Sequence, residues 1–445
     1  MTIRRREFLK VAGAQAGLLA LGGCATATAR STGPLSNGMG APALLPSSPD
    51  IAVIGAGALG GWTAYNLRKS GAKVLLIDAW GPGNSRSTSG DETRGVRTSY
   101  GDRPHGEQWM RWATQTIKKW KEWDDTVARE QDTRLFFTSG DLILRPAWEP
   151  YATTTLELFR KVGVRHAVLP MEEVRYRWPQ IDVSAHTVAL HEPDAGVVRA
   201  RRACESVASE FRRLGGDTTI ARATPTFREN GKLEGLQLDD GRRVQAGTYV
   251  FACGPWLGKV FPEVMGKRLK TPMGSVYYMG MPMGNHSFEW PNIPSWGTPA
   301  TTGWPSLPID NRGFRVRIGG LSATDPDLSQ RTLDPASEER LRKFLDENFP
   351  LLKDAPIMQT HSCHYELTPS RNFIITPHPD MSNVWIVGGG NAEAFKFGPM
   401  IGDYSAKRIL GHDDQPELAA GFALGKEFED TPPTPPKAAT PSERP

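Results

Sequence analysis

Apolar runs of strand length alternate with helix-like segments from residue 51 onward. Residues 51–54 (IAVI) are apolar and mostly β-branched, which is typical of a strand buried in a parallel sheet. Residues 62–70 follow with a helix-like pattern, and a second apolar run covers residues 73–77. This strand–helix–strand order predicts an α/β fold.

Two later segments are also expected to be helical. One covers residues 203–214 and leads into a strand-rich stretch that ends near residue 250. The other carries four tryptophans at mixed spacing, which we interpret as a stripe facing the core. These four are Trp109, Trp112, Trp120 and Trp123.

The N-terminus departs from this pattern. Arg5 and Arg6 open a twin-arginine motif (RREFLK), and a largely apolar stretch of 13 residues follows from 11 to 23. A bilayer-spanning helix needs about 20 residues, so this stretch is too short to be one. We interpret residues 1–29 as a signal peptide for export to the periplasm by the twin-arginine (Tat) machinery, and residues 30–49 as a flexible linker.

Cys24 leaves two forms of the exported protein open. It ends the sequence LGGC, which looks like a lipobox and would make Cys24 a lipidated N-terminus. The ATATA sequence that follows offers an ordinary cleavage site instead. The sequence does not choose between a lipid anchor at Cys24 and a protein without one.

Composition and charge narrow the class of protein. The 53 basic and 49 acidic side chains give a formal charge of 53 − 49 = +4, and much of this excess lies in the first ten residues. The rest of the chain is nearly neutral, which argues against nucleic-acid binding. Four cysteines are too few for a disulfide scaffold and lack the spacing of a zinc site. Residues 430–445, with six prolines, are expected to be disordered.

The first strong chemical signal is a glycine-rich turn after the first strand. In residues 55–60 (GAGALG), Gly55 permits a tight turn, Gly57 lets the backbone approach a pyrophosphate, and Gly60 allows the helix to pack closely on the strand. The pyrophosphate would then lie at a helix N-terminus. Asp78 ends the second apolar run, 18 residues after Gly60, where an acidic group binds an adenosine ribose. Together these features predict a dinucleotide site, either for FAD or for NAD.

Two arginines follow the dinucleotide motif. Arg94 and Arg97 lie three residues apart in the segment GDETRGVRTSYG (90–101) and can point to one side of a helical turn. Such guanidinium groups can bind a carboxylate or stabilise negative charge on a reduced cofactor. From the residues alone, two surface arginines are the favoured interpretation.

The same segment resembles the flavin-contacting stretch of the monomeric sarcosine oxidase family, within the D-amino-acid-oxidase-like group of FAD enzymes. The family pattern is Gly-Asp-Thr-Arg, two apolar residues, Arg, two residues and Tyr; this chain inserts Glu92 and has Gly95 at one apolar position. The resemblance covers most of residues 50–411 and implies that Thr93 binds the cofactor. Three further segments carry it: LFFTSGDLIL (135–144), HEPDAGVV (191–198) and VFACGPW (250–256).

The resemblance implies an α/β architecture in which a Rossmann-type FAD-binding domain carries an inserted substrate domain with a mixed sheet. The FAD-binding domain is expected in three segments, residues 50–130, 191–265 and 359–429. The substrate domain is expected in two, residues 131–190 and 266–358.

A cysteine near the C-terminus is the candidate for a covalent flavin link. Residues 363–369 (CHYELTP) match a family segment whose cysteine is bonded through sulfur to the flavin ring. The resemblance therefore implies FAD attached through Cys363. A buried free thiol is one alternative, and a metal site with His361 and His364 is another, which has poor geometry for a tetrahedral metal.

Residues 395–398 (FKFG) complete the family pattern. In the family, the lysine and the second arginine together hold the substrate carboxylate, which implies this role for Lys396 and Arg97. The resemblance also implies that Tyr365 lines the substrate pocket and that Gly398 lies at the cofactor.

One departure from the family concerns the strand around Arg317. We align Arg317 with a lysine that lies beside the flavin in sarcosine oxidases and speeds electron transfer to oxygen. Arginine keeps the charge but is larger and planar, so the oxygen site could be closed. Four residues later Leu321 stands where the family often has an active-site histidine, which makes sarcosine a doubtful substrate. Three tryptophans in or beside this region, at positions 290, 296 and 304, are either pocket or core residues.

We therefore expect oxidation of the C–N bond of an amino acid or N-substituted amino acid to an imine. Arg94 and Arg317 are the predicted catalytic residues, because positive charge near the flavin ring favours its reduced, anionic form. The electron acceptor is either oxygen or, in a dehydrogenase, a quinone or carrier protein. A third hypothesis is a flavin-binding protein without amine turnover.

Overall fold

The computed structural model describes residues 48–429, with gaps at residues 298–300, 309, 311, 320–322 and 334. The predicted signal peptide with Cys24, most of the predicted linker, Leu321 and the tail from residue 430 lie outside the described residues.

A six-stranded sheet contains the strands predicted at the start of the folded region. Its order is β19-β20-β13-β1-β2-β9, and only β19 runs antiparallel to its neighbour. The bounds are β1 (Ile51–Ile54), β2 (Val74–Asp78), β9 (Asp217–Ile220), β13 (Thr248–Phe251), β19 (Ile374–His378) and β20 (Met381–Gly388). The predicted α/β class is confirmed.

Apolar side chains cover both faces of this sheet, because alternate residues of a strand point to opposite faces. On β1, Ile51 and Val53 join a core with helices on one face, while Ala52 and Ile54 join a core on the other face. The helices on the first face are α1 (Ala58–Lys69), α2 (Gly106–Trp123), α5 (Ala200–Arg213) and α9 (Gly398–Ile409). The second core includes the short helices α6 (Leu257–Val260) and α7 (Pro262–Met265) and strand β11 (Lys232–Leu238).

The four tryptophans of α2 are all buried, as predicted. Trp109 and Trp112 pack in the core beside the six-stranded sheet, and Trp120 and Trp123 pack against Trp62 of α1. The helix therefore packs along its length against the half of the chain that contains the six-stranded sheet, and a π-helical turn, η1 (Asp124–Ala128), follows it.

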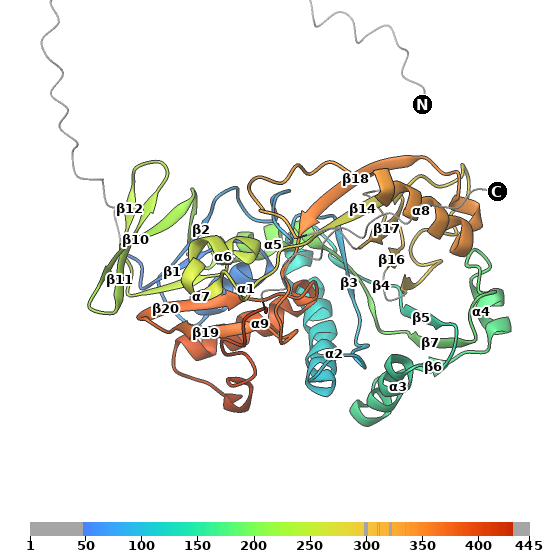
Figure 1. Cartoon of the computed structure of the whole chain (residues 1–445), viewed down its shortest axis with the longest axis horizontal. Helices are drawn as coiled ribbons and strands as arrows, with labels where there is room; N and C mark the ends of the chain where they lie inside the picture. The colour runs from blue at the N-terminus through green and yellow to red at the C-terminus, as the bar shows by residue number, and fades with distance from the viewer. Residues whose placement is uncertain are drawn as a thin grey trace, which may run out of the picture. The chain divides into compact units, whose positions relative to one another are not determined.

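An eight-stranded mixed sheet forms the second large layer. Its order is β18-β14-β17-β16-β15-β5-β7-β6, and only β15 and β5 are parallel. The bounds are β5 (Asp141–Arg145), β6 (Ala167–Val168), β7 (Val188–Glu192), β14 (Met273–Met279), β15 (Ser295–Gly297), β16 (Thr301–Trp304), β17 (Phe314–Ile318) and β18 (Ile357–His364). In Figure 1 the labelled strands of the six-stranded sheet lie left of centre, and most of those of the eight-stranded sheet lie to the right.

Helix α8 (Pro335–Asn348) packs on one face of the eight-stranded sheet. Its Phe344 contacts Trp296 of β15, and both rings contact Phe349, which follows the helix. Two further helices belong to this half of the chain: α3 (Pro150–Val162) and α4 (Met171–Arg177). On the opposite face, Ala152 and Leu156 of α3 pack against Ile143 of β5 and Leu190 of β7.

Two small sheets complete the strand arrangement. One, β3-β8-β4, consists of β3 (Thr93–Val96), β4 (Phe136–Thr138) and β8 (Gly196–Arg199). The other, β10-β11-β12, adds β10 (Ala223–Glu229) and β12 (Arg243–Val244) to β11. Short 3-10 turns are η2 (Gly254–Trp256), η3 (Pro350–Leu352), η4 (Ala394–Phe397) and η5 (Pro416–Leu418).

Strand β18 bears on the predicted domain boundaries. It pairs with β14 in the eight-stranded sheet, although most of its residues lie in the segment 359–429 expected in the FAD-binding domain. The boundaries drawn from the sequence stay predictions.

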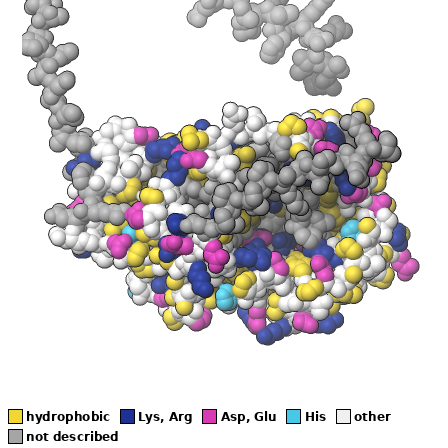
Figure 2. All heavy atoms as spheres, viewed as in Figure 1, with side chains coloured by type: hydrophobic (Ala, Val, Ile, Leu, Met, Phe, Trp, Pro, Cys, Tyr) yellow, Lys and Arg dark blue, Asp and Glu magenta, His cyan; other side chains and the backbone are white. Residues whose placement is uncertain are grey.

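The visible surface carries charges of both signs. Figure 2 shows Lys and Arg side chains interspersed with Asp and Glu, in keeping with the small formal charge. Within the part of the chain that the structure describes, no helix has the length and apolar character needed to cross a membrane.

Candidate active site

The turn between β1 and α1 depends on two glycines that leave no room for a side chain. Gly55 has φ +107°, and a Cβ on it would lie 2.3 Å from the carbonyl oxygen of Ala252 on the neighbouring strand connection. A Cβ on Gly60 would lie 1.9 Å from the carbonyl oxygen of Gly55. The helix can therefore start close to the end of β1 only with glycine at both positions.

Gly57 has a different environment. The nearest atom to a Cβ there is the hydroxyl of Ser89, at 3.2 Å, and Gly57 lines a cavity. Glycine at this position leaves the backbone bare toward the cavity, beside the N-terminus of α1. This is the arrangement that an approaching pyrophosphate requires.

The carboxylate of Asp78 organises the loop beyond β2. Its Oδ2 accepts a hydrogen bond from the backbone N–H of Ala56 at 2.7 Å, and its Oδ1 accepts those of Trp80 and Gly81 at 2.9 Å. Burial raises the pKa of Asp78, and these backbone donors oppose the rise. Oδ1 also accepts from the Asn84 side chain at 3.3 Å. Among the described residues Oδ2 accepts one hydrogen bond, so it keeps an acceptor position for a ribose hydroxyl.

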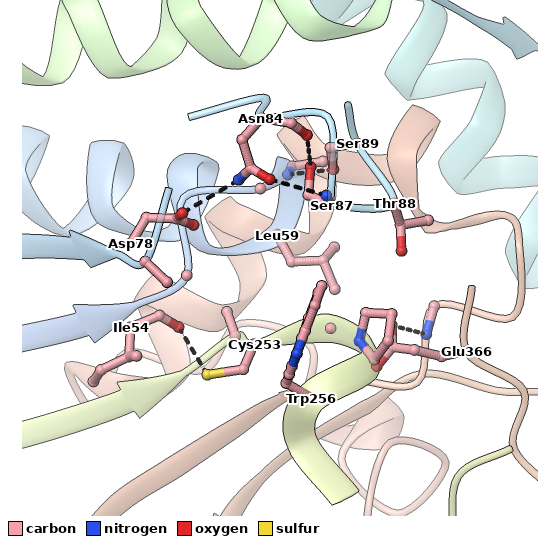
Figure 3. A pocket seen from close by; sticks show the side chains of 18 of the residues that line it. Ile54, Leu59, Asp78, Asn84, Ser87, Thr88, Ser89, Cys253, Trp256 and Glu366 are labelled. Atoms are coloured by element: carbon pink, nitrogen blue, oxygen red, sulfur yellow. Dashed lines mark hydrogen bonds between the residues drawn. The ribbon is translucent and has the colours of Figure 1, made fainter. Parts of the chain in front are cut away.

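These groups line a cavity of about 430 Å³. Figure 3 shows Leu59 and Trp256 pointing toward one another across it, with Asp78 and Asn84 joined by a hydrogen bond at one side. Cys253 lines the cavity and donates a long hydrogen bond, 3.5 Å, to the carbonyl oxygen of Ile54. Burial raises the pKa of the Cys253 thiol, which disfavours its thiolate form.

A second cavity of about 160 Å³ lies against the eight-stranded sheet. On β5, β16 and β17 the lining residues lie two apart, because strand side chains alternate between faces. From the sheet these are Asp141, Ile143 and Arg145 of β5, Trp296 and Gly297 of β15, Thr302 and Trp304 of β16, Arg315 and Arg317 of β17, Val276 of β14 and Cys363 of β18. Lining residues shared by the two cavities show that they adjoin: Thr88, Arg94, Tyr365, Ala392, Glu393 and Phe395.

Cys363 is buried at this junction, close to a cation. The Arg94 guanidinium lies 3.9 Å from its sulfur and also pairs with the buried carboxylate of Asp91. Burial raises the pKa of Cys363, but His361 and the charge of Arg94 lower it, and the net result lies below the usual value. A lowered thiol pKa increases the fraction of reactive thiolate.

The neighbouring His364 faces the other way. Its ring nitrogens contact the carbonyl oxygen of Thr271 at 2.9 Å and the hydroxyl of Ser329 at 2.5 Å. Cys363 and His364 are successive residues on β18 and point to opposite faces. The three side chains of the alternative metal site, with His361, do not converge.

The structure brings Arg97 and Lys396 together around a carboxylate, and this carboxylate belongs to the chain itself. Arg97 donates to Glu393 Oε1 at 3.2 Å, and Lys396 donates to Glu393 Oε2. Burial raises the pKa of Glu393, but Lys396, Arg97 and Arg103 hold it well below its usual value. Burial lowers the pKa of Lys396 to about 8, against the opposing effect of Glu393.

Arg317 and Tyr365 lie together in the second cavity. The Arg317 guanidinium stands 5.0 Å from the centre of the Tyr365 ring, a cation–π contact. Tyr365 lines both cavities, so this pair lies where they adjoin.

The remaining residues singled out from the sequence have surroundings that differ from one another. Thr93 is buried on β3, and the described lining of neither cavity includes it. Gly398 starts α9, where a Cβ would lie 2.6 Å from the Trp62 ring, so it serves the packing of α9 on α1. Trp296 and Trp304 line the second cavity, whereas Trp290 packs on Phe137.

Two cavity carboxylates were missed by sequence reasoning. Glu393 lies three residues before Lys396, a spacing that brings side chains together on a helical turn and could have indicated the pair. Asp141 lies on β5, where burial raises its pKa to about 6 against the effects of Arg97, Lys396 and Arg145. No signal in the sequence marks Asp141.

The residues of the first cavity fit a dinucleotide with FAD chemistry. Gly57 leaves a bare backbone at a helix N-terminus, Asp78 has a free acceptor position, and the cavity continues to a thiol and guanidinium at the junction with the second cavity. An isoalloxazine ring at that junction would adjoin both Cys363 and the second cavity.

Known relatives and solved structures agree with this fit. A monomeric sarcosine oxidase of a Bacillus species is 26% identical over 374 residues, covering 81% of this chain and 92% of the relative. The N-methyl-L-tryptophan oxidase of Citrobacter koseri is 24% identical over 391 residues, covering 85% and 95%. In fold, the chain is similar to an L-proline dehydrogenase from P. horikoshii (TM-score 0.74, 20% identity, 85% and 98% covered).

A glycine oxidase of Bacillus cereus has the same fold, with a TM-score of 0.70 at 18% identity over 85% of this chain and 99% of the other. A model of the DAO family, described as FAD dependent oxidoreductase, matches residues 50–408. The chain belongs to this family of FAD-dependent oxidoreductases.

Proposed function

We propose that the protein oxidises the C–N bond of an amino acid or an N-substituted amino acid to an imine, which then hydrolyses. The observation that carries this proposal is the junction of the two cavities at Arg94, Tyr365 and Glu393. A small substrate in the cationic second cavity would adjoin the cavity that fits the flavin. The sarcosine and N-methyl-L-tryptophan oxidases among the relatives support an amine substrate.

FAD supplies the two-electron chemistry, and the chain supplies its placement. Gly55, Gly57 and Gly60 would position the pyrophosphate at the N-terminus of α1, and Asp78 would bind the ribose. Arg94 and Arg317 would add positive charge beside the ring system and favour its anionic, reduced form.

Cys363 is our candidate for covalent attachment of FAD. The lowered pKa of this buried thiol, the Arg94 guanidinium at 3.9 Å and its place at the junction of the cavities all support the assignment. A thiolate in this position is the nucleophilic form that a sulfur–flavin bond requires.

The electron acceptor is oxygen in the first form of this proposal. Arg317 lines the cavity at the position that aligns with the oxygen-activating lysine of sarcosine oxidases, and this favours a second form in which a quinone or carrier protein takes the electrons. The twin-arginine motif supports export of the folded holoenzyme, either with a lipid at Cys24 or without one.

The proposal is tested on purified holoenzyme with a panel of secondary and N-methyl amino acids. Anaerobic bleaching of the visible flavin bands by one of them is the expected result. Readmission of air with rapid recovery of colour and peroxide formation would identify an oxidase. Slow recovery in air and fast recovery with a soluble quinone would identify a dehydrogenase. A flavin that dithionite bleaches but no amine does would contradict the proposal and favour a flavin-binding protein without amine turnover.

A further inference from the structure

We propose that Glu393 occupies the Arg97–Lys396 pair as a permanent internal carboxylate, and that Arg317 receives the carboxylate of the substrate instead. This inference rests on the proposed function, since it assigns the anion-binding part of the same cavity. It makes Glu393 a determinant of substrate specificity and gives Arg317 direct contact with the substrate.

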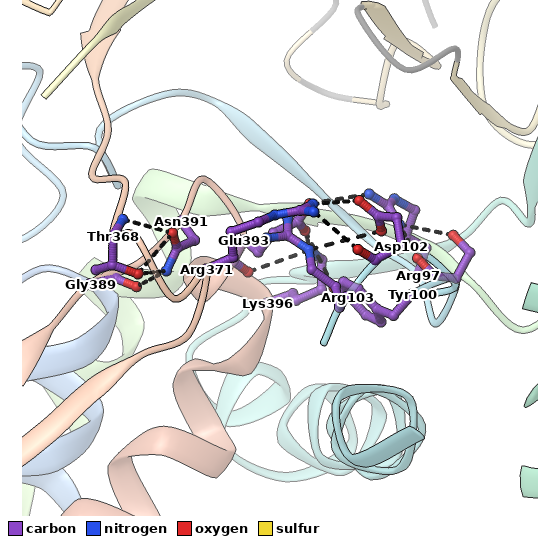
Figure 4. A network of polar contacts seen from close by, with 11 residues as sticks. Arg97, Tyr100, Asp102, Arg103, Thr368, Arg371, Gly389, Asn391, Glu393 and Lys396 are labelled. Carbon is purple, nitrogen blue, oxygen red and sulfur yellow. Dashed lines mark hydrogen bonds and ion pairs between the residues drawn. The ribbon is translucent and has the colours of Figure 1, made fainter. Parts of the chain in front are cut away.

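The hydrogen bonds of Glu393 leave little capacity for exchange. Its Oε1 accepts from Arg97 at 3.2 Å and from Arg103 at 3.4 Å, and its Oε2 accepts from Lys396 and from the Tyr100 hydroxyl at 3.3 Å. Figure 4 shows these side chains converging on the one carboxylate. A substrate carboxylate would have to replace Glu393 on cations that already have a partner.

The turn that carries Glu393 is held in a fixed, strained conformation. Asn391 and Ala392, just before it, have φ angles of +49° and +59°, which non-glycine residues rarely adopt. The Asn391 side chain accepts from the Thr368 N–H at 3.0 Å and donates to the carbonyl oxygens of Asn372 at 2.9 Å and Gly389 at 2.6 Å. These hydrogen bonds therefore fix the backbone that holds Glu393 beside the cations.

The charges at this end of the cavity also disfavour binding of a substrate carboxylate. Asp141 is 6% exposed and lines the cavity near Arg97, Lys396 and Arg145, all of which lower its pKa, while Glu393 raises it. Two carboxylates of the chain thus already face these cations. A third negative charge would meet repulsion and would have few unpaired donors.

Arg317 offers the opposite environment. Among the described residues, every other cation that lines the second cavity has a carboxylate partner: Arg94 and Arg315 pair with Asp91, Arg145 pairs with Glu149, and Arg97 and Lys396 pair with Glu393. Arg317 has no ion pair within this part of the chain and contacts only the Tyr365 ring by its charge. A partly buried guanidinium without an ion-pair partner is suited to bind the carboxylate of a ligand.

The sheet register separates the two ends of the cavity. Arg317 on β17 stands opposite Thr302 on β16, and Gly297 on β15 connects that row to Ile143 on β5, next but one to Asp141. With neighbouring strands about 4.8 Å apart, β17 and β5 are separated by about 14 Å. Arg317 can thus bind an anion away from the Asp141 carboxylate.

Acetate is a probe for the anion site that needs no turnover. Titration of the oxidised holoenzyme with acetate, at constant ionic strength set with chloride, is followed by the change in the flavin absorption bands. We expect Arg317→Met to weaken acetate binding at least tenfold. Arg342→Met, on α8 and away from both cavities, is the matched control and should bind acetate as the wild type does.

Removal of Glu393 should free the second anion site. Glu393→Ala is expected to bind acetate at least tenfold more tightly than the wild type. In the double variant with Arg317→Met, the freed Arg97–Lys396 pair should restore the binding that Arg317→Met alone loses. Glu393→Gln, which removes the charge and keeps one acceptor oxygen, should show a smaller gain and serves if the alanine variant does not fold.

Two results would overturn the inference. Acetate affinity of Arg317→Met within threefold of the wild type would place the anion site elsewhere. Failure of the double variant to regain binding would show that Glu393 does not hold the pair closed. Both results are independent of amine oxidation, so they are distinct from a failure of any amine to bleach the flavin.

Discussion

The thiol of Cys363 and the carboxyl of Glu192 are both buried, yet the pKa of the thiol is lowered and the pKa of the carboxyl is raised. Arg94 and His361 stand beside Cys363 and stabilise the thiolate, so its pKa is lowered. Among the described residues Glu192 forms no ion pair, and it accepts the N–H of Thr98 at 2.9 Å. Burial raises its pKa to about 8, and the Thr98 N–H and the charge of Arg97 oppose the rise without cancelling it. The neighbouring charge, rather than burial itself, decides which group is ionised.

Replacement of Cys363 tests the covalent link. In the wild type the yellow colour should stay with the protein after acid precipitation. In Cys363→Ala it should pass into the supernatant as free FAD, because no sulfur remains to bond the ring. Cys204→Ala is the control, since Cys204 is buried on α5, outside the lining of both cavities. Release of FAD from the wild type would refute the link.

Glu192 makes a prediction about stability and pH. Between its ordinary pKa of 4.5 and its folded pKa of about 8, the folded protein keeps a proton that the unfolded chain has lost. Stability therefore falls as pH rises through this window and the loss is complete above it. Glu192→Gln keeps an acceptor for the Thr98 N–H and removes this dependence.

Urea unfolding of the wild type and of Glu192→Gln at about pH 5, 7 and 8.5 measures the effect. These pH values span the range between the ordinary pKa of 4.5 and the folded pKa of about 8. The variant should gain stability relative to the wild type as pH rises. Glu122→Gln, at an exposed position of α2, should show no such trend. A constant difference between wild type and Glu192→Gln across the three pH values would contradict the assignment.

At the scale of elements, the turn from β1 to α1 and the turn before η4 place the chemical groups. The first could be predicted from the sequence because Gly55, Gly57, Gly60 and Asp78 lie within one strand–helix–strand unit, where spacing determines geometry. The second could not, because the partners of Glu393 lie far away in the chain: Arg97 is separated from it by 296 positions. Only the packing of β3 beside η4 brings them together.

Adjacent glycines of α1 provide a matched pair of substitutions. Gly60→Ala would place a Cβ 1.9 Å from the Gly55 carbonyl oxygen, whereas Gly61→Ala would have no atom nearer than 3.8 Å. We expect Gly60→Ala to cost about 2 kcal/mol or more and to lose FAD. Gly61→Ala should keep FAD and gain about 0.5–1 kcal/mol from the higher helix propensity of alanine.

Thermal unfolding and the ratio of flavin to protein absorbance measure both effects. Equal behaviour of the two variants would show that the close contact of α1 with the end of β1 does not support the cofactor site.

At the scale of the whole molecule, each of the two large sheets carries one of the two adjoining cavities. The six-stranded sheet carries the nucleotide turn at the ends of its strands, and one face of the eight-stranded sheet lines the second cavity. The α/β class and the buried tryptophans of α2 could be predicted, because periodicity reports on burial. The alternation that places Asp141 and Arg317 on one face could not, since it depends on how β5, β15, β16 and β17 pair.

Export is a property of the whole chain that the twin-arginine motif predicts. Replacement of Arg5 and Arg6 by lysine should retain the folded holoenzyme in the cytoplasm of a bacterium with the twin-arginine route, because that route recognises the arginine pair. Fractionation with detection of the protein and its flavin measures this. Unchanged periplasmic yield would contradict the signal-peptide interpretation of residues 1–29.

The central claim is tested most directly by an anaerobic titration of the holoenzyme with an N-methyl amino acid, with the carbonyl product measured alongside the flavin spectrum. The account predicts that the flavin bands bleach and that each flavin reduced is matched by one carbonyl compound from hydrolysis of the imine. A flavin that stays oxidised with every secondary and N-methyl amino acid, or that is reduced without any carbonyl product, would contradict amine oxidation at this site.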